Sequence, residues 1–263
     1  MLKNLLLTIS FVLSGLMLQA QSWEVGAFAG ASGYMGDINP REFYRYTDLA
    51  YGAQVKRNFD GYWSAKLNLM HGNIWASDAE TTSAYQKQRD LAFYSPLSEA
   101  SLQVEFNFFD YTAGMSRTRI TPYLFTGIGG IIFNPQRRIN DGSTITNYEL
   151  KDYLTEGQEK PYQTMALSIP YGIGVKYNFK GFWSLIAEVG YRTAFTDYLD
   201  DVSKNYPTDL AAITGVRRSL SDPSYDDTLA GVQRGDYRKT DTYMFAGLSL
   251  TFTFVSRNCP VAR

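Results

Sequence analysis

Residues 51–64 read YGAQVKRNFDGYWS, and residues 171–184 read YGIGVKYNFKGFWS. Nine of the fourteen positions are identical, although the two copies start 120 residues apart. Each copy alternates in polarity into a turn and out again, and a period of two is that of a β-strand. Asp60-Gly61 and, more weakly, Lys180-Gly181 predict a two-residue hairpin turn. The repeat therefore indicates equivalent hairpins in two halves of one closed β structure.

The first 20 residues have the features of a secretory signal. Lys3 supplies a positive charge, residues 5–18 form an apolar stretch, and Ala20 is a small residue at the expected cleavage site. We expect residues 1–20 to be a signal peptide, with a single membrane anchor as the alternative. The rest of the chain has no apolar stretch of 18 residues, so no transmembrane helix is predicted.

The composition favours a β-rich protein with many turns. Among 263 residues there are 20 Tyr, 16 Phe, 4 Trp and 22 Gly. The formal net charge is −1, so bulk electrostatics do not point to nucleic acid. The single cysteine, Cys259, excludes an internal disulfide. In an oxidising compartment, a disulfide to a partner and a free thiol are the alternatives.

Polarity alternation predicts eight strands, each long enough to cross a bilayer at a tilt. They are expected at 22–36, 46–59, 62–75, 100–110, 121–134, 164–179, 182–196 and 241–254. The second and third strands, and the sixth and seventh, are joined by tight turns, and 111–120 is a moderate connection. The long connections are 37–45, 76–99, 135–163 and 197–240.

Alternating short and long connections are typical of outer-membrane barrels, which have short periplasmic turns and long external loops. We therefore predict an all-β fold. Residues 21–254 are expected to form an eight-stranded antiparallel up-and-down transmembrane β-barrel, and residues 255–263 a periplasmic tail.

Most predicted strands have one apolar face and one small or polar face. Leu248 and Leu250, for example, alternate with Ser249 and Thr251. An eight-stranded barrel has room inside only for side chains, so the bulky face is expected to point to lipid. The strand at 121–134 is apolar on both faces, and its orientation stays open. A periplasmic aromatic girdle is expected from Phe59, Tyr62, Trp63, Phe179, Phe182 and Trp183.

Charged residues recur on the faces expected to point inward. They are Glu24, Glu105, Glu188, Lys56, Lys66, Lys176 and Arg192. Buried charges must be paired, because an isolated one costs several kcal/mol or more. We predict a lumen plugged by ion pairs, with a gated ion path as the alternative.

The sequence favours a non-enzymatic protein without cofactor or metal. His71 is the single histidine, and no convincing nucleophile neighbours it in the expected strands. The GIGG segment at 127–130 lacks the spacing of a phosphate-binding loop. Asp197, Asp200 and Asp201 could hold a divalent cation, but their spacing matches no known loop. A solvated loop entry is the preferred interpretation, and the loop at 197–240 is long enough to be a lid or a partner surface.

Four segments resemble the PorG-type outer-membrane barrels of the type IX secretion system of Bacteroidetes-like bacteria. They are YMGDIN at 34–39, FTDYLDDVS at 195–203, the closing strand TYMFAGLSLTFTF at 242–254, and Asn258-Cys259-Pro260. The TDYLDD block is the most distinctive of these. The resemblance covers nearly the whole chain after the signal.

This resemblance implies a barrel in the outer membrane that associates with a periplasmic ring containing a lipoprotein. In that family the ring is needed for export of cargo and, in some members, for gliding. The partner surface is then expected on the periplasmic side, at Arg117, Arg119, Arg257, Asn258, Cys259 and Pro260. The alternatives are a stand-alone structural barrel, a narrow porin or, less favoured, a lipid-modifying enzyme using His71.

Overall fold

The computed structural model describes residues 22–40, 42, 44–81, 83–140 and 144–255. The strands are β1 (Ser22–Met35), β2 (Tyr46–Asn58), β3 (Trp63–Ser77), β4 (Ala92–Asn107), β5 (Ile120–Phe133), β6 (Gln136–Asn140), β7 (Ile145–Glu149), β8 (Met165–Lys180), β9 (Trp183–Ala194) and β10 (Asp241–Val255). The short helices are η1 (Asp78–Glu80), α2 (Ala84–Arg89), η2 (Leu150–Tyr153), η3 (Leu210–Ala212), α3 (Gly215–Ser221) and η4 (Asp227–Leu229). No helix in these ranges has the length and apolar character needed to cross a membrane.

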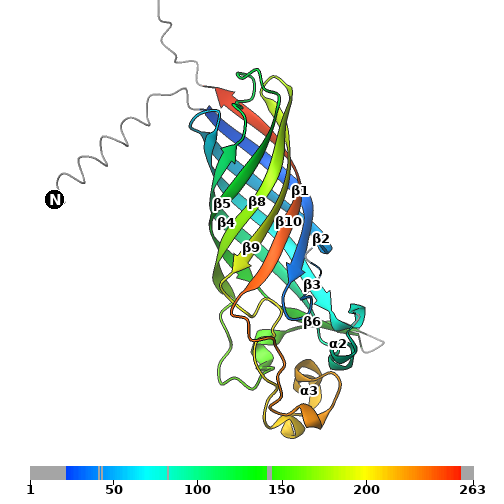
Figure 1. Cartoon of the computed structure of the whole chain (residues 1–263). Coiled ribbons are helices and arrows are strands. Elements are labelled where there is room, and N and C mark those ends of the chain that lie inside the picture. The colour runs from blue at the N-terminus through cyan, green and yellow to red at the C-terminus, as the bar shows by residue number, and fades with distance from the viewer. Residues whose placement is uncertain (1–21, 41, 43, 82, 141–143, 256–263) are drawn as a thin grey trace, which may run out of the picture.

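Eight long strands close into an antiparallel barrel (Figure 1). The sheet order is β3-β2-β1-β10-β9-β8-β5-β4, and pairing of β3 with β4 completes the ring. Ser22 pairs with both Asn58 and Val255, so the beginning of β1 and the end of β10 lie beside the β2–β3 turn. This end, with connections 59–62, 108–119 and 181–182, is called the turn end. The opposite end, which carries the four long connections, is called the loop end. The predicted fold class is confirmed.

The predicted strand assignment is wrong in two places. The fourth strand begins at Ala92 rather than at residue 100, because Phe93 and Leu97 continue its inward face to the loop end. Pro96 lies between them, and a proline argues against a strand when only the sequence is read. The connection predicted at 135–163 is also not all loop, because β6 and β7 form a short hairpin there. Five-residue strands with mixed polarity give too little periodicity to be recognised.

The two repeated hairpins are present, but their turns differ from the prediction. Between β2 and β3, four residues turn, and the Asp60 carboxylate accepts hydrogen bonds from the backbone N–H groups of Tyr62 and Trp63. Between β8 and β9, the turn is Gly181–Phe182, shifted by one residue from the predicted Lys180-Gly181. Gly181 has φ +52°, a left-handed conformation that glycine adopts without strain.

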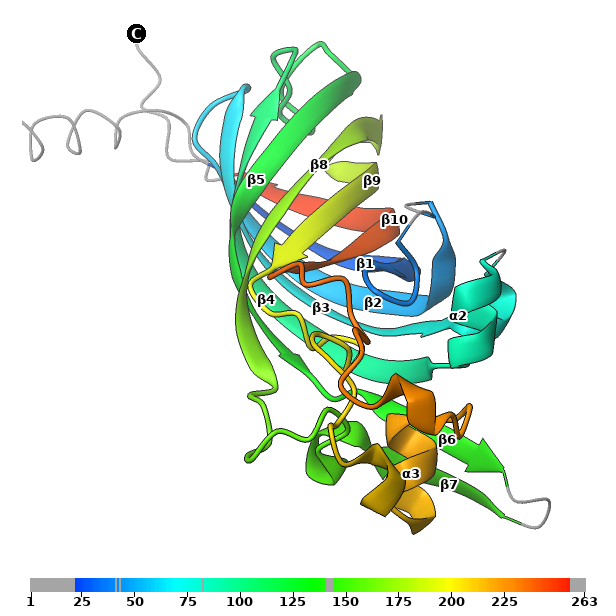
Figure 2. The ribbon, with the colours of Figure 1, turned by 60° about the horizontal axis from the view of Figure 1, so that its bottom comes forward.

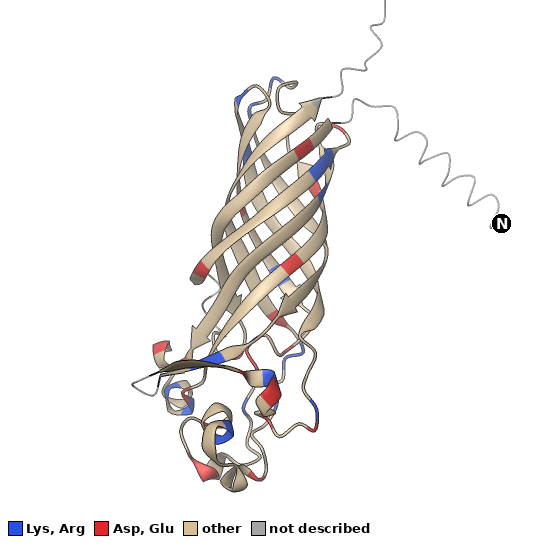
Figure 3. Cartoon of the chain, turned by 180° about the vertical axis from the view of Figure 1, so that it is seen from behind, with Lys and Arg blue, Asp and Glu red and all other residues tan. Residues whose placement is uncertain are grey.

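The outer surface of the barrel is apolar, as predicted. Leu67, Leu102 and Ile173 are 48%, 54% and 61% exposed, whereas Lys66 and Gln103 beside them in sequence are buried. Charged residues occur at intervals along the strands and are more frequent in the connections of the loop end (Figure 3).

The orientation of β5, which the sequence left open, is settled by its burial pattern. Tyr123, Phe125 and Phe133 point inward, and Leu124 and Ile128 point outward. The tertiary structure decides this because the inward rings find charged partners. Lys176 lies 4.4 Å from the centre of the Tyr123 ring, and Lys66 lies 4.9 Å from that of Phe125.

The interior is most highly charged in the half near the turn end, whereas bulky apolar side chains join small polar ones near the loop end. This corrects the expectation of small and polar side chains throughout the lumen. Near the loop end, bulky apolar side chains of the barrel pack against those of the long connections in one core. Its members include Phe28, Phe93, Phe133, Phe245, Ile38, Leu150, Leu199 and Leu220. The long connections therefore fold as a cap over and beside the barrel mouth, with α2, α3 and the β6–β7 hairpin around it (Figure 2).

Candidate functional site

The lumen near the turn end holds a compact network of ion pairs. Glu105 lies at its centre, 3.2 Å from Lys56, 3.0 Å from Lys66 and 2.6 Å from Lys176. Glu24 pairs with Lys56 at 3.1 Å, and Glu188 pairs with Lys66 at 2.8 Å. Three lysines thus balance three glutamates, and none of the six side chains is more than 9% exposed. Such pairing offsets the cost of removing charges from water.

A second layer of charged and tyrosine side chains lies between this network and the apolar core near the loop end. Arg192 pairs with Glu99 at 3.2 Å and approaches Glu188 at 4.0 Å. Tyr243 and Tyr123 donate hydroxyl hydrogen bonds of 2.6 Å to Glu99 and Glu188, respectively. The structure thus brings together all seven charges expected in the lumen. Sequence reasoning missed Glu99 because it lay in a segment predicted as loop.

The β4–β5 connection closes the turn end of the barrel. Tyr111 is 4% exposed, its hydroxyl lies 2.6 Å from Ser184 Oγ of β9, and its backbone N–H donates to Gly61 O. Burial raises the pKa of Tyr111 to about 12, so this phenol stays protonated and available for hydrogen bonding. A ring thus covers the ion-pair network where a solute would have to enter.

Exposed aromatic and basic side chains surround this closed end. Trp23, Tyr62, Trp63, Phe179, Phe182 and Trp183 are 40% to 48% exposed, and Phe59 is 38% exposed. Arg117 and Arg119 are exposed in the β4–β5 connection. The other expected partner residues, Arg257, Asn258, Cys259 and Pro260, lie outside the described residues, as do the predicted signal peptide and nearly all of the predicted tail.

The cap at the loop end is held by buried arginines. Arg89 binds Asp78 at 2.7 Å and also donates to the carbonyls of Arg234 and Asp37. Arg234 pairs with Glu156 and Asp201, so segments from all four long connections are joined. This corrects the interpretation of the acidic run as a solvated loop entry, because Asp200 and Asp201 are 1% and 0% exposed.

The buried carboxylate of Asp201 has three polar partners. Thr155 and Tyr162 donate hydroxyl hydrogen bonds to it, and Arg234 lies 3.4 Å away. Burial nevertheless raises the pKa of Asp201 to about 6, with Arg234 opposing the shift.

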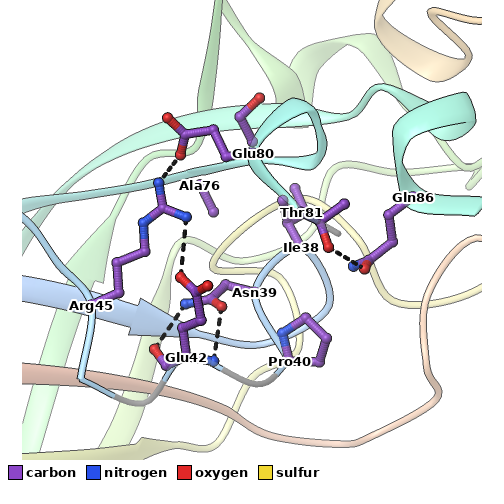
Figure 4. Close-up of a pocket in the computed structure, with 10 residues that line it drawn as sticks. Ile38, Asn39, Pro40, Glu42, Arg45, Ala76, Glu80, Thr81 and Gln86 are labelled. Atoms are coloured by element: carbon purple, nitrogen blue, oxygen red, sulfur yellow. Dashed lines mark hydrogen bonds and ion pairs between the residues drawn. The ribbon is translucent and has the colours of Figure 1, made fainter. Parts of the chain in front are cut away.

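A small cleft beside the first long connection is lined by polar groups that already bind one another (Figure 4). Arg45 reaches the carboxylates of Glu42 and Glu80, and Thr81 donates to the Gln86 side chain. Its volume is about 60 Å³. That space suits a few water molecules rather than an organic ligand.

His71 does have a hydroxyl neighbour, which corrects the expectation that no nucleophile lies beside it. His71 Nδ1 and Ser98 Oγ are 2.9 Å apart on paired strands of the barrel exterior, and Tyr51 lies against the imidazole. Among the described residues, no carboxylate is hydrogen-bonded to His71. A serine nucleophile ordinarily needs its base to be oriented by a third group.

The sequence matches the model of one protein family, described as a domain of unknown function (DUF6089), over residues 3–263. The chain belongs to this family. No curated protein matches the sequence.

Solved structures similar to this DUF6089 chain are bacterial β-barrels. Neisserial surface protein A has 8% sequence identity and a TM-score of 0.45, covering 90% of this chain and 100% of its own. The outer membrane protein OprG of Pseudomonas aeruginosa has 11% identity and a TM-score of 0.43, covering 89% and 97%. The E. coli outer membrane protein W has 14% identity and a TM-score of 0.39, covering 90% and 100%. Similarity at these levels carries no information about function.

Proposed function

We propose that the protein is a non-enzymatic outer-membrane barrel that anchors or docks a periplasmic ring of the type IX protein secretion machinery. The signal peptide exports the chain, and the barrel inserts with its turn end toward the periplasm and its loop end outside. The apolar outer surface supports insertion, because it presents hydrocarbon where a soluble barrel would present polar groups.

The observation that carries this proposal is the filled lumen. Six paired charges, a layer of tyrosines and the Tyr111 ring occupy the barrel from the turn end inward. A barrel filled in this way has no space for a secreted protein, so its role belongs to its surfaces. The exposed aromatic and basic side chains at the turn end, including Arg117 and Arg119, are the surface available to a periplasmic partner.

The test is affinity purification of the tagged, full-length chain from native membranes. We expect a stoichiometric periplasmic assembly that includes an outer-membrane lipoprotein. The double variant Arg117→Ala/Arg119→Ala should recover several-fold less of it, whereas Lys87→Ala, an exposed site at the loop end, should recover as much as the wild type. Recovery of the barrel alone, or crosslinks only from the loop end, would overturn the proposal.

Cys259 gives a separate measurement at the tail. If it bridges the lipoprotein, a non-reducing gel of wild-type envelopes contains a larger species that the Cys259→Ser variant lacks. An unchanged pattern in the variant excludes this bridge and leaves the thiol free.

A stand-alone structural barrel is the second candidate. It is supported by the same filled lumen together with the cap, whose buried ion pairs form a rigid outer surface without any partner. Purification as a monomer, with an envelope defect but intact secretion in a deletion strain, would favour it over the docking role.

A lipid-modifying activity would have to use His71 and Ser98. In that case both His71→Ala and Ser98→Ala would abolish phospholipid hydrolysis by an otherwise normally inserted barrel. We expect no hydrolysis by the wild type, because no carboxylate of the described ranges is hydrogen-bonded to the pair and the neighbouring backbone N–H groups belong to the strand ladder.

A further inference from the structure

Three aspartates from separate points of the cap converge at the loop end. Asp37 follows β1, Asp197 follows β9, and Asp236 precedes β10. Each offers a carboxylate oxygen, and these three oxygens lie within 4.8 Å of one another. They meet because β1, β10 and β9 are consecutive in the barrel wall.

One carboxylate oxygen of Asp37 has no hydrogen-bond partner. Asp37 is 6% exposed, and its Oδ1 accepts a 2.7 Å hydrogen bond from the backbone N–H of Asp236. Its Oδ2 is buried and receives no hydrogen bond. A buried carboxylate oxygen without a donor is costly and rare in folded proteins, and a bound ion is one of its ordinary explanations.

The surroundings add negative charge rather than balance it. Asp200 and Asp241, 1% and 2% exposed, are close enough to act electrostatically on Asp37. The described residues that donate hydrogen bonds to them are neutral groups of Tyr34, Val202 and Leu199. The nearby buried arginines form their ion pairs with other carboxylates, Arg89 with Asp78 and Arg234 with Glu156 and Asp201. Arg89 reaches Asp37 only at its backbone carbonyl.

One ion pair does reach the cluster. Arg238, 58% exposed, contacts Asp236 at 3.0 Å from the solvent side.

We propose that Asp37, Asp197 and Asp236 bind a divalent cation, and that this cation is Ca²⁺. All three ligands are hard carboxylate oxygens, and the cluster contains no His or Cys that would favour zinc or copper. Calcium accepts an irregular shell of carboxylates, carbonyls and waters, as loops of unequal length provide, whereas magnesium demands near-octahedral geometry. The ion ties both ends of the 195–240 connection to the connection after β1, and so holds the cap on the mouth.

The test uses the full-length protein in detergent micelles, freed of metal with EDTA and titrated with Ca²⁺ by calorimetry. We expect one site, with a dissociation constant of roughly 10⁻⁴ to 10⁻³ M, as in other extracellular calcium modules. Asp37→Asn and Asp197→Asn should each weaken binding at least ten-fold. Asp209→Asn, an exposed carboxylate in the same connection, should bind like the wild type.

A second readout separates loss of the ion from loss of the fold. In EDTA, protease should cut the wild-type chain within 197–240, and Ca²⁺ should protect it, whereas Asp37→Asn should give the same digestion pattern with and without Ca²⁺. Asp236→Asn changes the most exposed ligand and keeps the test valid if the buried variants do not fold. Absence of saturable binding, unchanged binding in all three variants, or equal affinity for Mg²⁺ would overturn the assignment.

Discussion

Glu105 is the most highly connected charged residue in the ion-pair network of the lumen. It faces three lysines from β2, β3 and β8, within 3.2 Å of each. Removing one member of a buried ion pair costs more than the pair contributes, because the remaining charge is left uncompensated. The network is therefore vulnerable at this residue.

We expect Glu105→Gln to destabilise the barrel by about 3 to 5 kcal/mol, since three buried lysines would face two glutamates. The measurement is the temperature at which the folded band disappears on a gel run without boiling. Glu149→Gln is the control, because that carboxylate is 45% exposed and pairs with Lys151 at the surface. Equal thermal unfolding of the two variants would contradict the role assigned to the lumen charges.

The raised pKa of Asp201 predicts that the stability of the cap depends on pH. Its pKa of about 6 in the folded cap lies above the ordinary value, so the folded state binds the proton more tightly than the unfolded state. Its stabilising contribution is complete below about pH 4 and is lost as the pH rises through 6, by roughly 3 kcal/mol at most. Urea unfolding of the cap, followed by near-ultraviolet circular dichroism of its tyrosines, measures this. The wild type should lose stability relative to Asp201→Asn between pH 4 and 7, and a constant difference would contradict the prediction.

At the scale of elements, the cap depends on short pieces that could not hold their shape alone. The helix α2 has six residues, and isolated helices of that length are unstable in water. Its Ser83 cap and the contacts of Arg89 with Asp78 and two backbone carbonyls fix it to the barrel mouth. The cap is thus stabilised by tertiary contacts rather than by local propensity.

Arg89→Met should loosen this arrangement. It leaves the Asp78 carboxylate buried without its partner, at a cost of about 3 to 5 kcal/mol. We expect faster protease cleavage in residues 78–91 and 197–240, with the barrel strands still resistant. Lys87→Met is the matched control, because this side chain is exposed on the same helix. Equal cleavage of both variants would show that Arg89 does not join the connections.

At the scale of the molecule, the barrel has one closed end and one capped end. Ion pairs and the Tyr111 ring fill the turn end, and an apolar core continuous with the cap fills the loop end. Purified protein in planar lipid bilayers should therefore give no conductance above background. A variant in which a short Gly-Ser linker replaces residues 197–238 should stay closed as well, because the lumen charges remain paired. Regular channel openings in the wild type would contradict the filled-lumen description.

The sequence by itself determined the barrel, the inward and outward faces of most strands and the identity of the lumen charges. These follow from a period-two pattern in which each residue's environment is set by its neighbours along the chain. Only the tertiary structure decided which way β5 faces, that β4 extends to Ala92, and that Asp37, Asp197 and Asp236 meet. Such features depend on contacts between residues far apart in sequence, such as Lys66 with Phe125, and no local pattern encodes which distant side chain arrives at a given place.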